Sequence, residues 1–332
     1  MSKRITGIPF CTNRHYNCLY VVLDSLLRFH GHEPTVPCFS NWDFVYLRDR
    51  RRFAIDGRAI PLPTMLGAFG IGLSHRAEAD PEAAWKAVRS LLDTGTPVAV
   101  SVDVHALARA GLYPRLRHAD HQYIAAGYDD RAGTVHLIDP SPWQPSARDI
   151  PLGLFLASWD MSAFSGVRDR YNWTWLRAPA QPPALGRATT QALLRRNLRS
   201  MSATRGQAGP VMGLEGIRQL AVDAGAWAGR EDADLQSHLR HCARLLLEIA
   251  VLREGHGRFL GHLGRLFDQP GLAALGAELG TISQGWFVAK SLCLKGALKE
   301  PASLLPRIQS RLQDIGAREG KALAGLAEAV EW

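Results

Sequence analysis

Apolar residues in the first part of the chain follow two periods, which predicts a mixture of helices and strands. Positions 19, 22, 23, 26 and 27 share one face of a helix that begins at Cys18, with Asn17 as its N-cap and Gly31 as its C-cap. A second helix is predicted from Pro81 to Leu92, and a strand from Thr96 to Val102. Helices packed on a mostly antiparallel sheet, an α+β fold, account for this order.

A hairpin follows and carries one polar residue at each open end. Tyr123 to Ala126 and Val135 to Ile138 have the pattern of two short apolar strands joined by turn residues. His121 opens the first strand and Asp139 ends the second, 18 positions later. Antiparallel pairing can therefore bring a base and the acid that orients it within hydrogen-bond reach.

The pattern changes near residue 180. Residues 171–176 alternate as an edge strand does, and Pro179 to Pro183 have the composition of a linker. The sequence beyond is rich in Ala, Leu and Arg, so we expect a catalytic domain over 1–180 and a helical domain over 181–332. The irregular stretch between residues 34 and 72 is expected to form loops and short strands at one wall of a cleft. The helices predicted in the second domain cover 190–203, 214–228, 233–252 or longer, 256–268, 270–297 with room for a break, and 303–330.

Composition narrows the class of protein. Of 332 residues, 46% are hydrophobic and 21% charged, which is enough for folded cores. The sequence shows neither an apolar run of membrane-spanning length nor the apolar core of a signal peptide, so we expect a cytoplasmic protein. The net charge of +8 comes without the basic stripe and stacking aromatics of a nucleic-acid binder. Arginine groups at 48–52 and 195–199 fit an acidic protein partner or a solvated basic face.

Cys18 differs in its setting from the other cysteines. The five cysteines are scattered without a CxxC pair, which is typical of free thiols in a reducing compartment. At the first position of a helix, unpaired N–H groups and the helix dipole favour a thiolate. A histidine within reach would make this thiolate a nucleophile, which predicts a Cys18–His121–Asp139 triad on a papain-like scaffold. The cysteines interpreted as structural are Cys11, Cys38, Cys242 and Cys293.

Two other interpretations of these residues remain open at this point. Cys18 can be a small buried residue and His121 a polar residue near a turn, in a protein that binds without catalysing. His118, Asp120 and His121 can also ligate a metal ion together with Cys18 or His15, although HxxH in an extended segment is a weak signal. We expect no resident metal, and His118 is the second choice of catalytic base.

The same residues resemble a known family, the butirosin biosynthesis protein H family. The stretches similar to its N-terminal domain are 17–19 with the helix that ends at Gly31, 121–123 running into 127–129, and 135–140. Residues 213–221 and the helices around Phe259 and Trp286 resemble the helical domain that accompanies it. The cysteine and histidine settings are shared with papain-like peptidases that process bacteriocins, from which the helical domain separates this family.

The resemblance implies an acyltransferase, an amide synthase of natural-product biosynthesis. Such an enzyme takes an acyl group from the phosphopantetheine thioester of an acyl carrier protein and passes it to an amine. Carried onto this sequence, Cys18 attacks the thioester, His121 serves as base and acid, and Asp139 orients His121. No bound cofactor is implied, because the phosphopantetheine arrives on the substrate. Carrier proteins are acidic, so the resemblance implies that the arginine groups bind the carrier protein.

The sequence departs from the papain-like pattern at the oxyanion hole. Thr12 stands where those enzymes have a glutamine, six positions before the nucleophile. Asn13, Asn17 or the backbone N–H of Cys18 are the candidate donors. A cysteine peptidase or peptide cyclase with the same triad is the competing enzyme class and predicts a cleft for extended peptide. We also expect a homodimer formed through a helical face.

Overall fold

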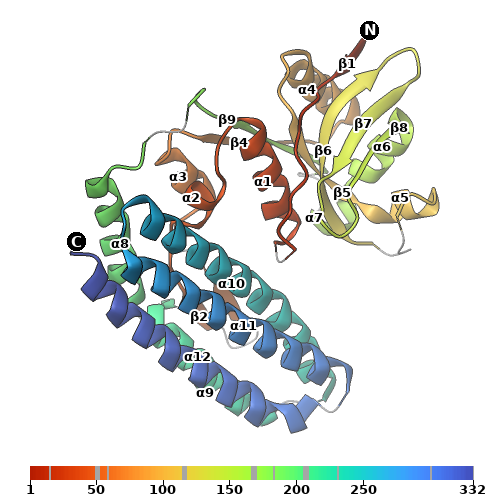
Figure 1. The fold of residues 1–332 in the computed structure, drawn as a ribbon. Coiled ribbons are helices and arrows are strands. Elements are labelled where there is room, and N and C mark those ends of the chain that lie inside the picture. Colours follow the sequence, from red (N-terminus) through yellow and green to blue (C-terminus); the bar gives the residue numbers. More distant parts are fainter. Residues whose placement is uncertain are drawn as a thin grey trace. The chain divides into compact units, whose positions relative to one another are not determined.

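Two compact units make up the chain in the computed structural model (Figure 1). Unit 1 comprises Met1–Pro34 and Leu66–Pro183, and unit 2 comprises Thr35–Met65 and Ala184–Trp332. The structure describes residues 1–14, 16–48, 53–57, 60–113, 118–165, 170–181, 184–204, 209–229, 232–299 and 301–331. This division differs from the predicted domains 1–180 and 181–332, because residues 35–65 pack with the helices of unit 2. The physical reason is that Phe39, Trp42 and Phe44 of this segment are fully buried there.

An antiparallel sheet forms the centre of unit 1, which confirms the predicted α+β class. Its strands pair in the order β4-β9-β5-β6-β7-β8, with β1 added beside β6. The strands are β1 (Ser2–Arg4), β4 (Gly72–Glu78), β5 (Val98–Asp103), β6 (Asp120–Asp129), β7 (Thr134–Asp139), β8 (Ser146–Pro151) and β9 (Tyr171–Arg177). The helices of unit 1 are α1 (Cys18–Phe29), α3 (Leu62–Gly67), α4 (Pro81–Asp93), α5 (Val104–Arg109), α6 (Leu152–Trp159) and α7 (Ser162–Ser165). Of these, α3 begins in unit 2 and ends in unit 1.

Strand β9 lies inside the sheet, between β4 and β5, so the prediction of an edge strand at 171–176 is wrong. Its alternating pattern has another cause. Tyr171 and Trp173 pack on Trp159 of α6 with ring centroids 5.7 and 6.0 Å apart, while residues between them are only half-buried. Alternation here marks one well-covered face of an internal strand.

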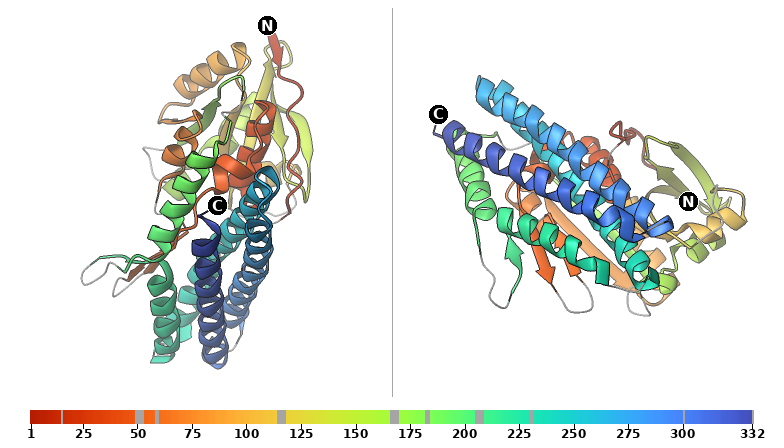
Figure 2. Two further views of the ribbon diagram at one scale, coloured as in Figure 1. Left: turned by 60° about the vertical axis from the view of Figure 1, so that its left-hand side comes forward. Right: turned by 90° about the horizontal axis from the view of Figure 1, so that it is seen from below.

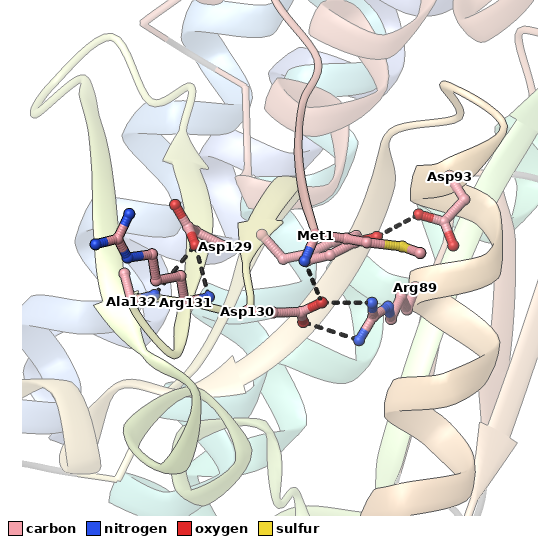
Figure 3. Close-up of polar contacts among 8 residues, drawn as sticks. Met1, Arg89, Asp93, Asp129, Asp130, Arg131 and Ala132 are labelled. Atoms are coloured by element: carbon pink, nitrogen blue, oxygen red, sulfur yellow. Dashed lines mark hydrogen bonds and ion pairs between the residues drawn. The ribbon is translucent and has the colours of Figure 1, made fainter.

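The turn that joins β6 to β7 is fixed by charged side chains (Figure 3). Asp129 accepts backbone hydrogen bonds from residues 131 and 132 at 2.8 and 3.1 Å, which closes the turn. The carboxylate of Asp130 accepts hydrogen bonds from both terminal nitrogens of Arg89, in α4, at 2.9 and 2.7 Å. Gly127 lies where a Cβ would collide with the backbone of Lys3 in β1. These contacts hold the hairpin in one register.

Unit 2 is mainly helical, as predicted for the second part of the chain. Figures 1 and 2 show its longest helices running side by side. Its elements are α2 (Thr35–Phe39), β2 (Val45–Arg48), β3 (Phe53–Asp56), α8 (Arg187–Met201), β10 (Val211–Met212), α9 (Gly213–Ala226), a short 3-10 turn (Trp227–Gly229), α10 (Asp232–Leu266), α11 (Pro270–Leu298) and α12 (Pro301–Ala329). None of the described helices is long and apolar enough to cross a membrane.

Helix α10 is continuous where two helices, 233–252 and 256–268, were predicted. The glycines near the expected break serve packing instead. A Cβ on Gly255 would overlap the ring of Phe39, and one on Gly257 would meet the backbone of Gly276 in α11. Glycine therefore lets the chain of unit 2 approach this helix closely without ending it. Helix α11 is likewise unbroken from Pro270 to Leu298.

A buried ion pair and its hydrogen-bond partners join four parts of unit 2, namely α10, α11, α12 and the segment 35–65. Arg253 of α10 donates to Glu319 of α12 at 2.8 Å, and both side chains are fully buried. The indole N–H groups of Trp42 and Trp286 also donate to the Glu319 carboxylate, at 3.1 and 2.8 Å. Arg253 further donates to the backbone oxygen of Asp43 at 2.9 Å. Buried charges are tolerated only when paired in this way, so the cluster fixes the segment 35–65 on the helices.

Candidate active site

Cys18 occupies the first turn of α1, as the sequence predicts. The side-chain oxygen of Asn17 accepts a hydrogen bond from the backbone N–H of Tyr20 at 3.1 Å, the geometry of an N-cap. Residues 20–27 of the helix are buried and anchor it in unit 1. The thiol is half-buried, so a nucleophile at this place is held by a rigid helix and still reachable.

Strands β6 and β7 bring His121 and Asp139 together. Their register pairs Ile124 with Ile138, which places the start of β6 beside the end of β7. The Nε2 atom of His121 lies 3.0 Å from an oxygen of Asp139, and the two side chains are 18% and 8% exposed. The second oxygen of Asp139 accepts a hydrogen bond from the backbone N–H of Ser141 at 3.0 Å. The acid is thus held on both sides and orients the ring.

The sulfur of Cys18 is the second hydrogen-bond partner of the His121 ring. Burial alone would lower the pKa of His121, but hydrogen bonds to Asp139 and to the Cys18 sulfur outweigh it and raise this pKa from 6.5 to about 9. Since Asp139 takes Nε2, the ring nitrogen left for the sulfur is Nδ1. The structure therefore brings together the three residues that the sequence singles out, with a protonated ring between sulfur and carboxylate at neutral pH.

The candidate oxyanion donors lie on the segment that leads into α1. Asn13 is buried, and Asn17 uses its oxygen as the helix cap, which leaves its amide N–H groups as donors. The backbone N–H of Cys18 belongs to the first helical turn, where such groups have no partner within the helix. The backbone N–H of Cys11 donates to the oxygen of Pro140 at 3.1 Å, which ties this segment to the residue after Asp139.

The remaining cysteines are buried, in agreement with a structural role. Burial and the nearby Asp24 carboxylate raise the pKa of Cys11 to about 12, which disfavours its thiolate. A hydrogen bond to Cys293, together with burial, raises the pKa of Cys242. Cys18 is half-buried rather than buried and contacts the His121 ring, so among the described thiols it is the best placed to act as a nucleophile.

His118 belongs to a different group of polar residues. Its Nδ1 atom lies 2.5 Å from Asp103, and its ring stacks on His105 with centroids 4.2 Å apart. Sequence reasoning missed Asp103, although an aspartate between an apolar strand and a short helix is an N-cap signal. Within the described ranges, no three His, Cys, Asp or Glu side chains are grouped to hold a metal. His15, named with the metal alternative, lies outside those ranges.

Two of the arginines expected to meet an acidic partner have partners within unit 2. Arg195 pairs with Glu331 at 3.1 Å, and Arg196 is a half-buried donor to the side chain of Asn41. Residues 49–52 of the other group lie outside the described part of the chain. Binding of an acidic partner stays a prediction.

Two family models match the chain. Residues 17–140 match Butirosin biosynthesis protein H, N-terminal, a range that contains Cys18, His121 and Asp139. Residues 163–326 match Domain of unknown function (DUF4872). No curated protein matches the sequence. The segment 17–140 therefore belongs to the N-terminal domain family of butirosin biosynthesis protein H, which confirms the resemblance found in the sequence.

Proposed function

We propose that this protein is an amide-forming acyltransferase of antibiotic or related natural-product biosynthesis. The observation that carries the proposal is the triad, in which His121 contacts both the Cys18 sulfur and Asp139. The family name ties the N-terminal domain to butirosin biosynthesis, and thus to a biosynthetic enzyme. The donor is the phosphopantetheine thioester of an acidic acyl carrier protein, and the acceptor is an amine. The enzyme itself needs no bound cofactor.

In the first half-reaction, the acyl group moves to the enzyme. The thiolate of Cys18 attacks the carbonyl carbon of the thioester, and the carbonyl oxygen becomes an oxyanion that the backbone N–H of Cys18 and amide N–H groups of Asn13 or Asn17 stabilise. The intermediate then expels the pantetheine sulfur, which takes a proton from His121. An acyl-Cys18 thioester and a neutral imidazole remain.

In the second half-reaction, the acyl group passes to the amine. The neutral His121 accepts a proton from the amine nitrogen as that nitrogen attacks the acyl-enzyme carbonyl. The bond between the carbonyl carbon and the Cys18 sulfur breaks, which releases the amide and restores the thiolate beside a protonated ring. Exchange between two thioesters is nearly isoenergetic, so formation of the more stable amide drives the cycle.

The test is intact-protein mass spectrometry after incubation with a panel of acyl-phosphopantetheine thioesters and acyl carrier proteins. We expect a mass increase that maps to Cys18, is lost when an amine is added, and does not occur in Cys18→Ala. Cys38→Ala is the matched control, because Cys38 is a buried cysteine of unit 2, whereas the triad residues belong to unit 1. Rapid alkylation of Cys18 without acylation by any thioester would refute the carrier-dependent reaction and favour a peptidase or cyclase.

A further inference from the structure

Two short segments next to the triad present an aromatic ring and a cation to solvent. Trp143 is 69% exposed, and among the large hydrophobic side chains of the described residues only Met1 is more exposed. The guanidinium carbon of Arg14 lies over this indole, 5.5 Å from the ring centroid, which is the geometry of a cation–π contact. Both residues belong to unit 1, which also holds the triad.

The segment that carries Trp143 is held against the catalytic acid. The backbone N–H of Ser141 donates to the Asp139 carboxylate at 3.0 Å, and the backbone N–H of Trp143 donates to the Ser141 hydroxyl oxygen at 3.4 Å. Pro140 and Pro142 restrict the backbone between these residues, because the proline ring fixes φ. The indole is therefore placed by short contacts that start from the acid of the triad.

Arg14 lies on the segment that leads into Cys18, and its neighbours anchor this segment. Cys11 and Asn13 are 2% and 6% exposed, whereas Arg14 is exposed. The backbone hydrogen bond from Cys11 to the oxygen of Pro140 joins this segment to the one that carries the indole. The cation and the aromatic ring thus meet because the two segments that enter and leave the triad are tied together.

The stacked pair suits an anion that has an apolar group directly beside it. Stacking covers one face of the guanidinium and leaves the N–H groups, which lie in its plane, able to donate to an oxyanion. Within the described residues Arg14 forms no ion pair, so no described carboxylate competes for these donors. The exposed indole offers apolar surface next to the charge.

The pair also lies at a suitable distance from the nucleophile. Arg14 precedes Cys18 by four positions and Trp143 follows Asp139 by four, so the Cα atoms of each pair are at most ~14 Å apart. Between its phosphorus and sulfur atoms, phosphopantetheine has about as many bonds as the backbone of four to five residues, so its arm extends to roughly 15 Å. A phosphate held at Arg14 can therefore present its thioester to Cys18.

We propose that Arg14 and Trp143 bind the phosphopantetheine arm of the acyl donor, Arg14 through the phosphate and Trp143 through the geminal methyl groups. The proposal rests on the proposed acyl transfer to Cys18. The carbon that carries these methyl groups is bonded to the CH2 of the phosphate ester. Guanidinium and indole therefore contact adjacent parts of one ligand, and the acyl group lies at the far end of the arm, towards Cys18.

The experiment compares three donors of the same acyl group, carried on phosphopantetheine, on pantetheine and on N-acetylcysteamine. Pantetheine lacks the phosphate, and N-acetylcysteamine lacks both the phosphate and the methyl groups. The acylation rate of Cys18 is measured by mass spectrometry at thioester concentrations far below saturation. We expect the phosphopantetheine thioester to react roughly 10- to 100-fold faster than the pantetheine thioester, the range of one charge-assisted contact.

Two variants and a matched control separate the two contacts. In Arg14→Gln, the phosphopantetheine and pantetheine thioesters should react alike, because glutamine has no charge to offer the phosphate. Trp143→Ala should slow both of these donors about 3- to 10-fold relative to the N-acetylcysteamine thioester, which has no methyl groups that could lose a contact. Arg131→Gln removes an exposed arginine of unit 1 at the turn of the β6–β7 hairpin, away from its open end, and should retain the preference for phosphate.

Two results would overturn the proposal while the proposed function stands. The first is acylation of Cys18 in the wild-type protein at equal rates by the phosphopantetheine and pantetheine thioesters. The second is a loss in Arg14→Gln that is limited to donors on an acyl carrier protein and spares free phosphopantetheine thioesters. That result would assign Arg14 to the surface of the carrier protein instead of the phosphate.

A second readout does not depend on acyl transfer. S-methyl phosphopantetheine, which has no acyl group to donate, should protect Cys18 from iodoacetamide at a concentration at least about 10-fold lower than S-methyl pantetheine requires. In Arg14→Gln the two compounds should protect alike. Absence of this difference in the wild-type protein would overturn the proposal even if no thioester acylates the enzyme. Protection of this kind without any acylation would instead refute the proposed acyl transfer and leave the binding site in place.

Discussion

The substitution Asp139→Asn tests the central contact of the candidate active site. The rise in the His121 pKa from 6.5 to about 9 corresponds to ~3 kcal/mol in favour of the protonated ring. Asp139 supplies the largest of the contributions that raise this pKa, through its hydrogen bond to the ring. A hydrogen bond to a charged group is worth about 2 kcal/mol, which we take as the effect of the substitution. Asparagine keeps the shape and can still accept the backbone hydrogen bond of Ser141. The amide nitrogen of asparagine, however, is a donor and would face Nε2, so the neutral ring would carry its proton on Nδ1. Nδ1 could then no longer act as the base towards Cys18.

The expected result is a fall in the His121 pKa towards 6.5 and a loss of roughly 30-fold in the alkylation rate of Cys18 at pH 7. NMR titration of labelled histidine measures the first, and timed iodoacetamide labelling the second. The same shift has a consequence for stability. Because the pKa of the folded protein is the higher one, the stabilising contribution is complete below pH 6.5 and is lost as the pH rises through about 9. An unchanged titration of His121 in Asp139→Asn would refute the assigned contact.

Substitutions at three further positions have expected outcomes. Asn17→Ala should lower the free energy of unfolding, measured with urea, by about 1 kcal/mol and should slow the alkylation of Cys18. Asn17→Ser should restore both, because serine also caps helices. Equal behaviour of the two variants would contradict the role of Asn17 as the cap. Glu319→Gln should destabilise the protein by roughly 3–5 kcal/mol in thermal unfolding, since Arg253 then loses its buried counter-ion; a change below about 1 kcal/mol would show that the pair is dispensable. Burial lowers the pKa of His256 to about 3, so the wild-type protein should lose stability as the pH falls from 6.5 towards 3. His256→Gln should lower the midpoint of acid unfolding measured by circular dichroism, and an unchanged midpoint would contradict this account.

The grouping of Cys18, His121 and Asp139 was predictable in part because some of its signals are local. Asn17 and Cys18 are adjacent, and the cap is a preference of single residue types at a helix start. His121 and Asp139 are distant in sequence, and the predicted hairpin brings the ends of its two strands together. The register shifts by one residue at a bulge between Ala125 and Gly127, which brings Asp139 to the face of His121, and the sequence pattern did not predict this bulge.

The residues that were missed depend on pairings between elements further apart. Asp103 meets His118 through the alignment of β5 with β6. A shift of one residue in this register would reverse the face of each side chain, and no local preference fixes it. The continuity of α10 through Gly255 was hidden for a similar reason, because the partner of that glycine is Phe39.

The early position of Phe39 in the chain has a consequence for synthesis on the ribosome. The Nδ1–H of His256 donates to the backbone oxygen of Phe39 at 2.8 Å across 217 positions of sequence. At ~5–20 residues per second, residues 35–65 emerge on the order of 10–40 s before α10 can cover them. Their aromatic side chains thus stay uncovered while residues 66–183, the larger part of unit 1, are made. A chain released after residue 183 would leave this segment permanently uncovered, so a single cut at the linker does not separate unit 1 from a segment that belongs to unit 2.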